Sequence, residues 1–134
     1  MESGRFNIVL GLVVMVASAF IGVALGQSME QYYVSGYAQI PLWRHLASAG
    51  HTHSMPFGLI NIVFGLLLAR AECSSGVKKA ASVLTALSLC LPLGTGLRGV
   101  TQGAPFTEII AMVGGLSMLA ACALMIRLQW CRKA

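Results

Sequence analysis

Three histidines and a methionine that lie close together are the side chains best suited to chemistry. They are His45, His51, His53 and Met55, and the sequence holds no other histidine. Neutral imidazole binds copper, zinc and haem iron, and a thioether favours Cu(I). The run from His51 to Met55 therefore predicts a metal site, with His45 as a further ligand.

Haem requires fewer protein ligands than copper, because one or two histidines can hold its iron. Arg44 and Arg98 could pair with the propionates. The candidate cofactors are thus haem b or copper, and the candidate haem-binding residues are His51, His53, Arg44 and Arg98. Two other interpretations stay open. The histidines could contact only water and lipid headgroups at a membrane surface, or they could bind a substrate or handle protons.

Other function classes find little in the sequence. It has no Gly-rich phosphate loop, no Ser-His-Asp set and no paired carboxylates, so whether the protein is an enzyme stays open. Glu108 is expected in the first turn of a helix, where its carboxylate interacts favourably with the helix dipole, or where it meets Arg98 or the histidines and tunes their protonation. The net charge is +5, but no basic stripe with interleaved aromatics occurs, which argues against nucleic-acid binding.

The elements that must position these residues are apolar. Hydrophobic residues make up 57% of the chain and charged residues 10%, whereas about a quarter of a soluble domain is charged. Four segments approach the roughly 20 residues that cross a bilayer as a helix. The sequence predicts one all-α domain, an integral membrane four-helix bundle, with helices at about residues 6–26, 54–71, 77–97 and 105–128 and an outer loop at about 27–53.

Prolines mark helix starts and one interruption. Pro56 and Pro105 are expected in first turns, where a missing N–H costs little, with Ser54 near the boundary of the second helix. Pro92 falls inside the third predicted helix and should kink it.

The basic residues predict the orientation. Seven of the nine are expected on the side shared by the termini and the middle loop, and only Arg44 and Arg98 on the other. Because cytoplasmic loops carry an excess of Lys and Arg, both termini are expected in the cytoplasm. The protein itself is expected in the inner membrane of a bacterium. Tyr32, Tyr33, Tyr37 and Trp43 in the outer loop are suited to a membrane–water interface.

The second predicted helix carries one polar face. Its residues recur at spacings of three and four: His51, Ser54, Gly58, Asn61 and Gly65. Asn61 near mid-membrane is costly unless it finds a partner, so Ser54 and Asn61 are expected to face the bundle interior or line a path through it.

Small side chains predict where helices approach closely. The first helix has Ser18, Gly22 and Gly26 at spacings of four, and the fourth has a second small or soft face: Ala111, Gly114, Gly115, Met118 and Cys122. Partners are therefore the lipid bilayer and, for these faces, either a second copy of the chain or other subunits of a membrane complex.

The stretch from Arg44-His45 through His51-Thr52-His53 to Asn61, leading into an apolar Gly-rich helix, resembles the second helix of haem-copper oxidase and nitric oxide reductase catalytic subunits. It is more similar to short four-helix membrane proteins grouped beside that superfamily. The resemblance implies His51 or His53 as an axial haem ligand in a respiratory or redox setting. The chain has no histidine after His53, so it lacks the ligands for an oxygen-reducing binuclear centre.

Two alternatives accompany this hypothesis. The protein could be a non-catalytic accessory subunit of a larger membrane complex. It also resembles, more weakly, the four-helix membrane glutathione transferases, whose second helix opens with a similar Arg and His motif. That motif includes an Asn and a Glu that this sequence lacks at the matching places.

Overall fold

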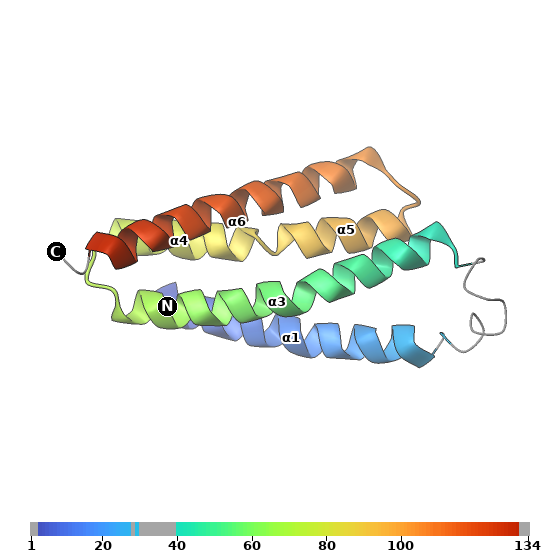
Figure 1. The fold of residues 1–134 in the computed structure, drawn as a ribbon, viewed down its shortest axis with the longest axis horizontal. Coiled ribbons are helices and arrows are strands. Elements are labelled where there is room, and N and C mark those ends of the chain that lie inside the picture. The colour runs from blue at the N-terminus through green and yellow to red at the C-terminus, as the bar shows by residue number, and fades with distance from the viewer. Residues whose placement is uncertain (1–2, 28, 30–39, 132–134) are drawn as a thin grey trace.

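The structure, a computed structural model, describes residues 3–27, 29 and 40–131, and that part of the chain is helical apart from short connections (Figure 1). Its helices are α1 (Ser3–Gln27), α3 (Leu42–Arg70), α4 (Ser75–Leu87), α5 (Cys90–Val100) and α6 (Pro105–Cys131). The helices α4 and α5 follow one another as a single interrupted rod, so four rods run back and forth. The predicted all-α, four-helix architecture is confirmed.

Each rod is long and apolar enough to cross a membrane. The four stretches are Gly4–Gln27, Leu42–Arg70, Ser75–Val100 and Pro105–Leu128. The shortest have 24 residues, which is about 36 Å of helix against a hydrocarbon core of about 30 Å. Large apolar side chains on their surfaces are open, such as Phe20 at 74% and Leu119 at 69% exposure. A lipid environment suits these surfaces, because hydrocarbon chains solvate such groups and water does not.

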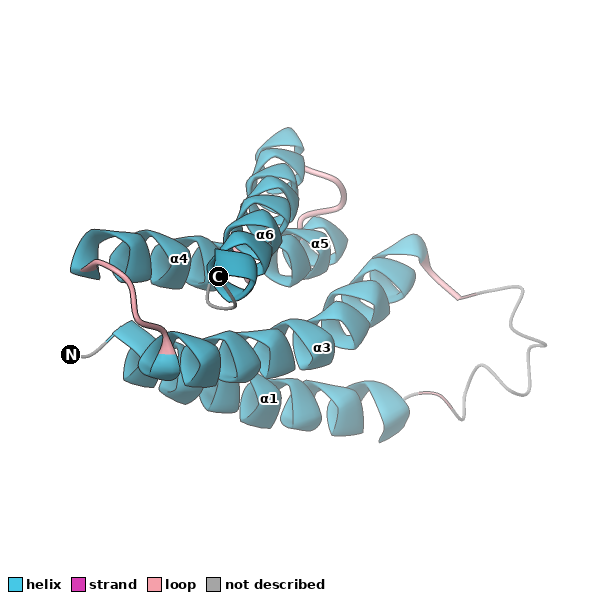
Figure 2. Ribbon diagram, turned by 60° about the vertical axis from the view of Figure 1, so that its left-hand side comes forward, coloured by secondary structure: helices cyan, strands magenta, loops and turns pink. Residues whose placement is uncertain are grey.

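The rods form two layers. Helix α1 lies along α3, and α6 packs against the α4–α5 rod on the other side (Figures 1 and 2). The start of α1, the end of α6 and the α3–α4 connection share one end, called here the terminal end. The start of α3 and the end of α5 lie at the opposite, distal end.

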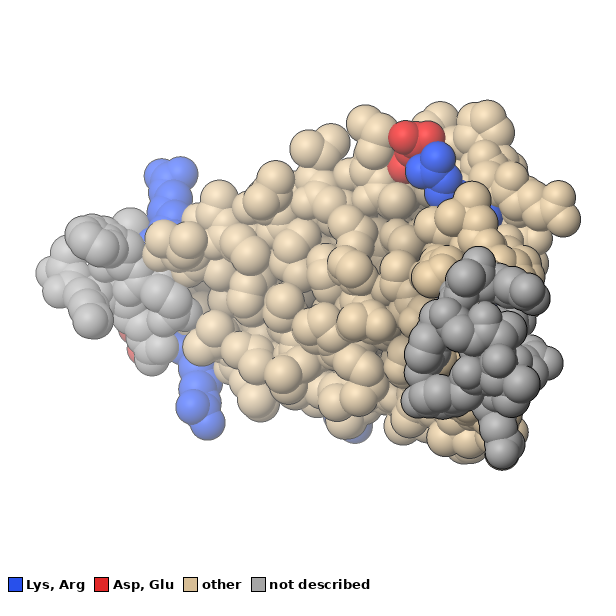
Figure 3. Space-filling view, turned by 45° about the vertical axis from the view of Figure 1, so that its right-hand side comes forward, with Lys and Arg blue, Asp and Glu red and all other residues tan. Residues whose placement is uncertain are grey.

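The basic residues divide between these two ends. Five of the seven assigned to the terminal end lie there: Arg5, Arg70, Lys78, Lys79 and Arg127. The other two, Arg132 and Lys133, are outside the described residues, as are Tyr32, Tyr33 and Tyr37. Arg44 and Arg98 lie at the distal end. Figure 3 shows Lys and Arg side chains at both ends of the molecule and a mostly uncharged surface between them.

The second helix begins earlier than the sequence predicts. The expected start at Ser54 and the outer loop through residue 53 are wrong, because α3 begins at Leu42. The hydroxyls of Thr52 and Ser54 do not cap a helix. Each donates to the carbonyl oxygen four residues earlier, at 2.8 and 2.7 Å. Pro56 consequently lies inside α3 rather than in its first turn, a position that membrane helices tolerate.

The predicted break at Pro92 is confirmed. The third rod is divided at Ser88 and Leu89, between α4 and α5. Pro92 has no N–H to donate to the carbonyl of Ser88, so that oxygen accepts from Leu91 N instead, at 3.1 Å. The Ser88 hydroxyl donates to the Thr85 carbonyl oxygen at 2.6 Å.

Glycines bring the helices into backbone contact. A Cβ atom on Gly65 of α3 would lie 2.6 Å from the carbonyl oxygen of Gly4 on α1. Gly114 of α6 touches the backbone of Cys90 and Leu91 in the same way. Such contacts maximise van der Waals attraction in lipid, where no hydrophobic effect drives helix pairing. Gly26, predicted on the packing face of the first helix, has no such neighbour within 4 Å.

Candidate functional site

The imidazole of His51 projects from α3 onto α1, where Ser18 binds it. Nδ1 lies 3.0 Å from Ser18 Oγ, and the same hydroxyl donates to the His51 carbonyl oxygen at 3.3 Å. The Ser18 oxygen accepts a hydrogen bond from Nδ1–H in the tautomer that protonates Nδ1, and its own proton then goes to the carbonyl. This tautomer leaves a lone pair on Nε2, the atom through which a neutral imidazole can bind a metal.

Gly22 makes room for this ring on the surface of α1. A Cβ atom at Gly22 would lie 2.6 Å from Cε1 of His51 and 2.9 Å from Nε2, closer than real Cβ atoms approach. The sequence predicts Gly22 as a helix-packing position, and the structure identifies the His51 ring as the group packed there. Even alanine at this position would displace the imidazole.

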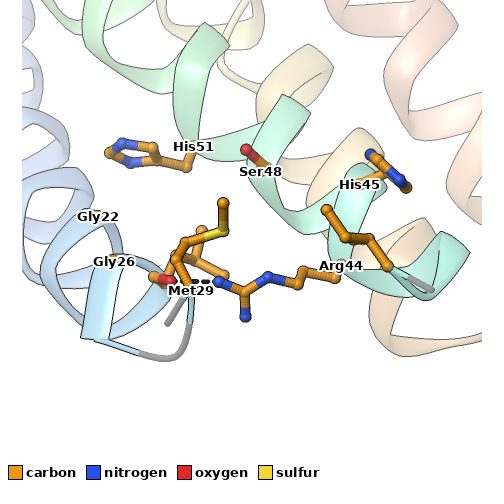
Figure 4. Close-up of a pocket in the computed structure, with 9 residues that line it drawn as sticks. Gly22, Gly26, Met29, Arg44, His45, Ser48 and His51 are labelled. Carbon is orange, nitrogen blue, oxygen red and sulfur yellow. Dashed lines mark hydrogen bonds between the residues drawn. The ribbon is translucent and has the colours of Figure 1, made fainter. Parts of the chain in front are cut away.

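Arg44 lies two turns before His51 and points to the same helix. Its side chain is only 3% exposed and donates to the carbonyl oxygen of Leu25, close to the end of α1. A cation is favourable at that position, because helix C-termini carry partial negative charge. Figure 4 shows the guanidinium of Arg44 and the ring of His51 both turned toward α1.

A cavity of about 420 Å³ lies between these two residues and the last turns of α1 (Figure 4). Its volume is within the range of small-molecule sites, roughly 300–1,000 Å³. The polar groups on its wall come from α3: Arg44, Ser48 and His51. The apolar groups come from α1 and from the segments next to α1 and α3: Leu25, Met29 and Ile40. The site is suited to a ligand that is apolar in its body and carries an anionic group.

The second histidine of the predicted string, His53, does not share the surroundings of His51. His53 is exposed, its Nδ1 lies 2.8 Å from the Ala49 carbonyl oxygen, and its ring is tilted against Phe57. Met55 is also exposed, and His45 lines the same cavity as His51. His51 and His53 are two residues apart on the helix and point to opposite sides, whereas Met55, four residues after His51, lies on the His51 face. Within residues 3–27, 29 and 40–131 no group of three or more His, Cys, Asp or Glu could hold a metal ion.

Arg98 is separated from the His51 cavity. It lies in the last turn of α5 and pairs with Glu108 of α6, its Nη2 3.7 Å from Oε2. The meeting of Glu108 and Arg98 that the sequence suggests is thus present. Arg98 lines a different cavity at the distal end, so the two predicted propionate partners, Arg44 and Arg98, do not share one site.

Asn61 is fully buried and faces the bundle interior, as the sequence predicts. Its Oδ1 accepts from Asn7 Nδ2 of α1 at 3.1 Å, and its own Nδ2 donates to the Thr85 carbonyl oxygen at 3.1 Å. Asn7 also donates to the Ser82 carbonyl at 3.0 Å and accepts from its hydroxyl at 2.5 Å. Three helices therefore meet in one polar cluster, made of Asn7, Asn61, Ser82 and Thr85.

This cluster satisfies itself and therefore stabilises the bundle. Among the described side chains that are not exposed, no buried nitrogen or oxygen atom lacks a hydrogen-bond partner. Ser54, the other residue predicted on the polar face, donates to the Gly50 carbonyl of its own helix. The polar face of α3 is thus used for helix association at Asn61 and for local bonding at Ser54.

Two residues of the site and its support were missed by sequence reasoning. Asn7 is a single polar residue near the start of an otherwise apolar segment, which is itself a signal that a partner is needed in lipid. The sequence predicts Ser18 only as a helix-packing residue, because it shares a face with Gly11 and Gly22 on α1. Its hydrogen bond to His51 depends on how α1 and α3 are aligned.

No known protein-family model matches this chain, and no curated protein and no solved structure is similar to it. The functional interpretation therefore depends on the geometry of the site and on the chemistry of its residues.

Proposed function

We propose that the protein is a small integral membrane protein that binds haem b at the distal end of its bundle, with His51 as the axial ligand. One observation carries this proposal. The Ser18 hydroxyl lies 3.0 Å from Nδ1 of His51, so Nε2 is the nitrogen left for a metal, and His51 lines a cavity with an apolar wall.

The residues of the cavity fit such a group. Leu25, Met29 and Ile40 supply apolar contact, and the cavity opens to the exterior, so a macrocycle larger than 420 Å³ would extend outward. Arg44 brings a cation for a propionate. A bound haem would supply reversible one-electron chemistry.

Haem is favoured over copper by the directions of the side chains. A copper site built from the His-x-His-x-Met string would require His51 and His53 to reach one ion. His51 faces α1 through Ser18, whereas the His53 ring is exposed and lies by Phe57. Haem iron requires only the nitrogen of His51 from this string.

The proposed setting is the inner membrane of a bacterium, with both termini in the cytoplasm. The excess of Lys and Arg at the terminal end supports this orientation, because cytoplasmic ends carry such an excess. The haem would then lie near the outer surface, in a respiratory or other redox context.

The test is an absorption titration of the detergent-purified apoprotein with haem b, in the oxidised and reduced states. We expect a Soret band and sharp reduced bands. His51→Ala should weaken haem binding by at least about tenfold. His53→Ala is the matched control and should leave binding unchanged. Equal effects of the two substitutions, or no spectral change in the unaltered protein, would refute the proposal.

A second candidate is an accessory subunit of a larger membrane complex or a homo-oligomer. It is favoured by the broad apolar faces on α1 and α6, where exposure ranges from 58% to 74%: Val16, Phe20, Val23, Leu116 and Leu119. These side chains suit contact with lipid or with neighbouring helices. Native mass spectrometry of the protein extracted from its own membrane distinguishes the candidates. A defined assembly without haem would favour the accessory role.

A further inference from the structure

A second cavity, of about 310 Å³, lies at the distal end between the start of α3 and the end of α5. Its wall combines apolar and polar groups: Leu42, Trp43, Leu46, Arg98, Gln102 and Gly103. Trp43 is 46% exposed and Leu42 is 73% exposed, at a helix end where tryptophan suits a membrane–water interface. The site is therefore placed where lipid headgroups meet the bundle.

The base of this cavity is fixed by backbone contacts. A Cβ atom on Gly99 would lie 3.0 Å from Ala47 N, so α3 and α5 touch directly below it. Helix α5 then ends with Gln102 at φ 54° and Gly103 at φ 93°. Gly103 N donates to the Arg98 carbonyl oxygen at 2.9 Å, as in a Schellman termination. These bonds fix the backbone at the end of α5, next to Arg98.

Arg98 on the wall of the cavity is paired with an opposite charge, Glu108 of α6. The Arg98 guanidinium and the Glu108 carboxylate are 3.7 Å apart, and their side chains are 43% and 57% exposed. Figure 3 shows an acidic and a basic side chain next to each other on the surface near one end of the molecule. A separation of 3.7 Å is longer than a hydrogen bond and both side chains are exposed, so both charges are accessible to another partner. A zwitterionic headgroup offers both charges that this pair would recognise.

We propose that this cavity binds a phosphatidylethanolamine molecule. Its phosphate accepts hydrogen bonds from Arg98 and Gln102, and its primary ammonium donates to Glu108. The glycerol and the first methylenes of the chains lie against Trp43, Leu42 and Leu46. The primary ammonium is favoured over a quaternary one, because only the former donates hydrogen bonds to a carboxylate. This inference does not depend on haem binding.

Trp43 fluorescence tests the proposal. The chain has two tryptophans, and Trp130→Phe leaves Trp43 as the only emitter. The protein is reconstituted in phosphatidylcholine vesicles that contain a small fraction of brominated phosphatidylethanolamine, phosphatidylglycerol or phosphatidylcholine. We expect the ethanolamine lipid to quench Trp43 more strongly than the other two at equal mole fraction. The expected preference is about two- to fivefold, which corresponds to the free energy typical of one exposed ion pair.

Two substitutions identify the recognised groups. Glu108→Gln is isosteric and exposed, so the protein should fold, and it should remove the preference for ethanolamine over choline. Arg98→Gln should lower quenching by all three lipids, whereas Arg127→Gln at the terminal end should change nothing. Equal quenching by the three lipids, or stronger quenching by phosphatidylglycerol, would overturn the proposal. So would an unchanged ethanolamine preference in the Glu108 variant.

Discussion

The cluster of Asn7, Asn61 and Ser82 gives the most quantitative prediction. Asn7 is buried on α1 and makes three hydrogen bonds, one with Asn61 of α3 and two with Ser82 of α4. Asn7→Ala removes all three at once. It also leaves the Ser82 hydroxyl and one lone pair of the Asn61 amide without this partner inside the bundle.

The magnitude follows from measured hydrogen bonds between membrane helices. These average about 0.6 kcal/mol each and reach about 1.7. Three such bonds correspond to about 2 kcal/mol of unfolding free energy. A double-mutant cycle of Asn7→Ala with Asn61→Ala isolates the single bond of 3.1 Å between the two amides. Its coupling energy should be about 0.6 kcal/mol.

The assay is unfolding of the purified protein in mixed micelles with increasing SDS, followed by circular dichroism. Thr52→Ala is the control, because the Thr52 hydroxyl is exposed and bonds within its own helix. That variant should stay within about 0.5 kcal/mol of the unaltered protein. A loss no larger for Asn7→Ala than for Thr52→Ala, or additive effects of the two asparagine substitutions, would refute the three-helix cluster.

Three further predictions concern packing, the His51 tautomer and topology. Gly65→Ala should destabilise the bundle by about 1–3 kcal/mol, since the new Cβ would lie 2.6 Å from the Gly4 oxygen. Gly76→Ala is the control, because a Cβ at Gly76 meets no atom within 4 Å. Equal unfolding midpoints for the two variants would contradict this prediction. Ser18→Ala should convert His51 to a mixture of tautomers in ¹⁵N NMR spectra of the apoprotein, and an unchanged Nδ1–H tautomer would show that Ser18 is not its acceptor. Single cysteines at positions 76 and 103, in a background without the native cysteines, should be labelled from the cytoplasm and from outside, respectively, and the reverse pattern would invert the orientation.

Local properties of the chain allowed most of the fold to be predicted. Apolar segments of spanning length, the place of Pro92 and the ends that carry Lys and Arg are all readable from neighbouring residues. Asn61 was assigned to the interior because an amide in hydrocarbon requires a partner. The start of α3 was not predicted, since Thr52 and Ser54 are typical caps but here bond to carbonyls of their own helix.

Residue types alone indicate which groups could do chemistry, whereas helix packing brings particular ones together. His51 and His53 look equivalent in the chain, but helical geometry turns them apart, and only His51 reaches Ser18, 33 residues earlier. Asn7 and Asn61 are 54 residues apart, and nothing local connects them. Arg44 and Arg98 were both expected at one haem, yet they lie in different cavities. Such pairings depend on how packed helices are rotated and aligned along one another. The close backbone contacts at glycines fix that alignment.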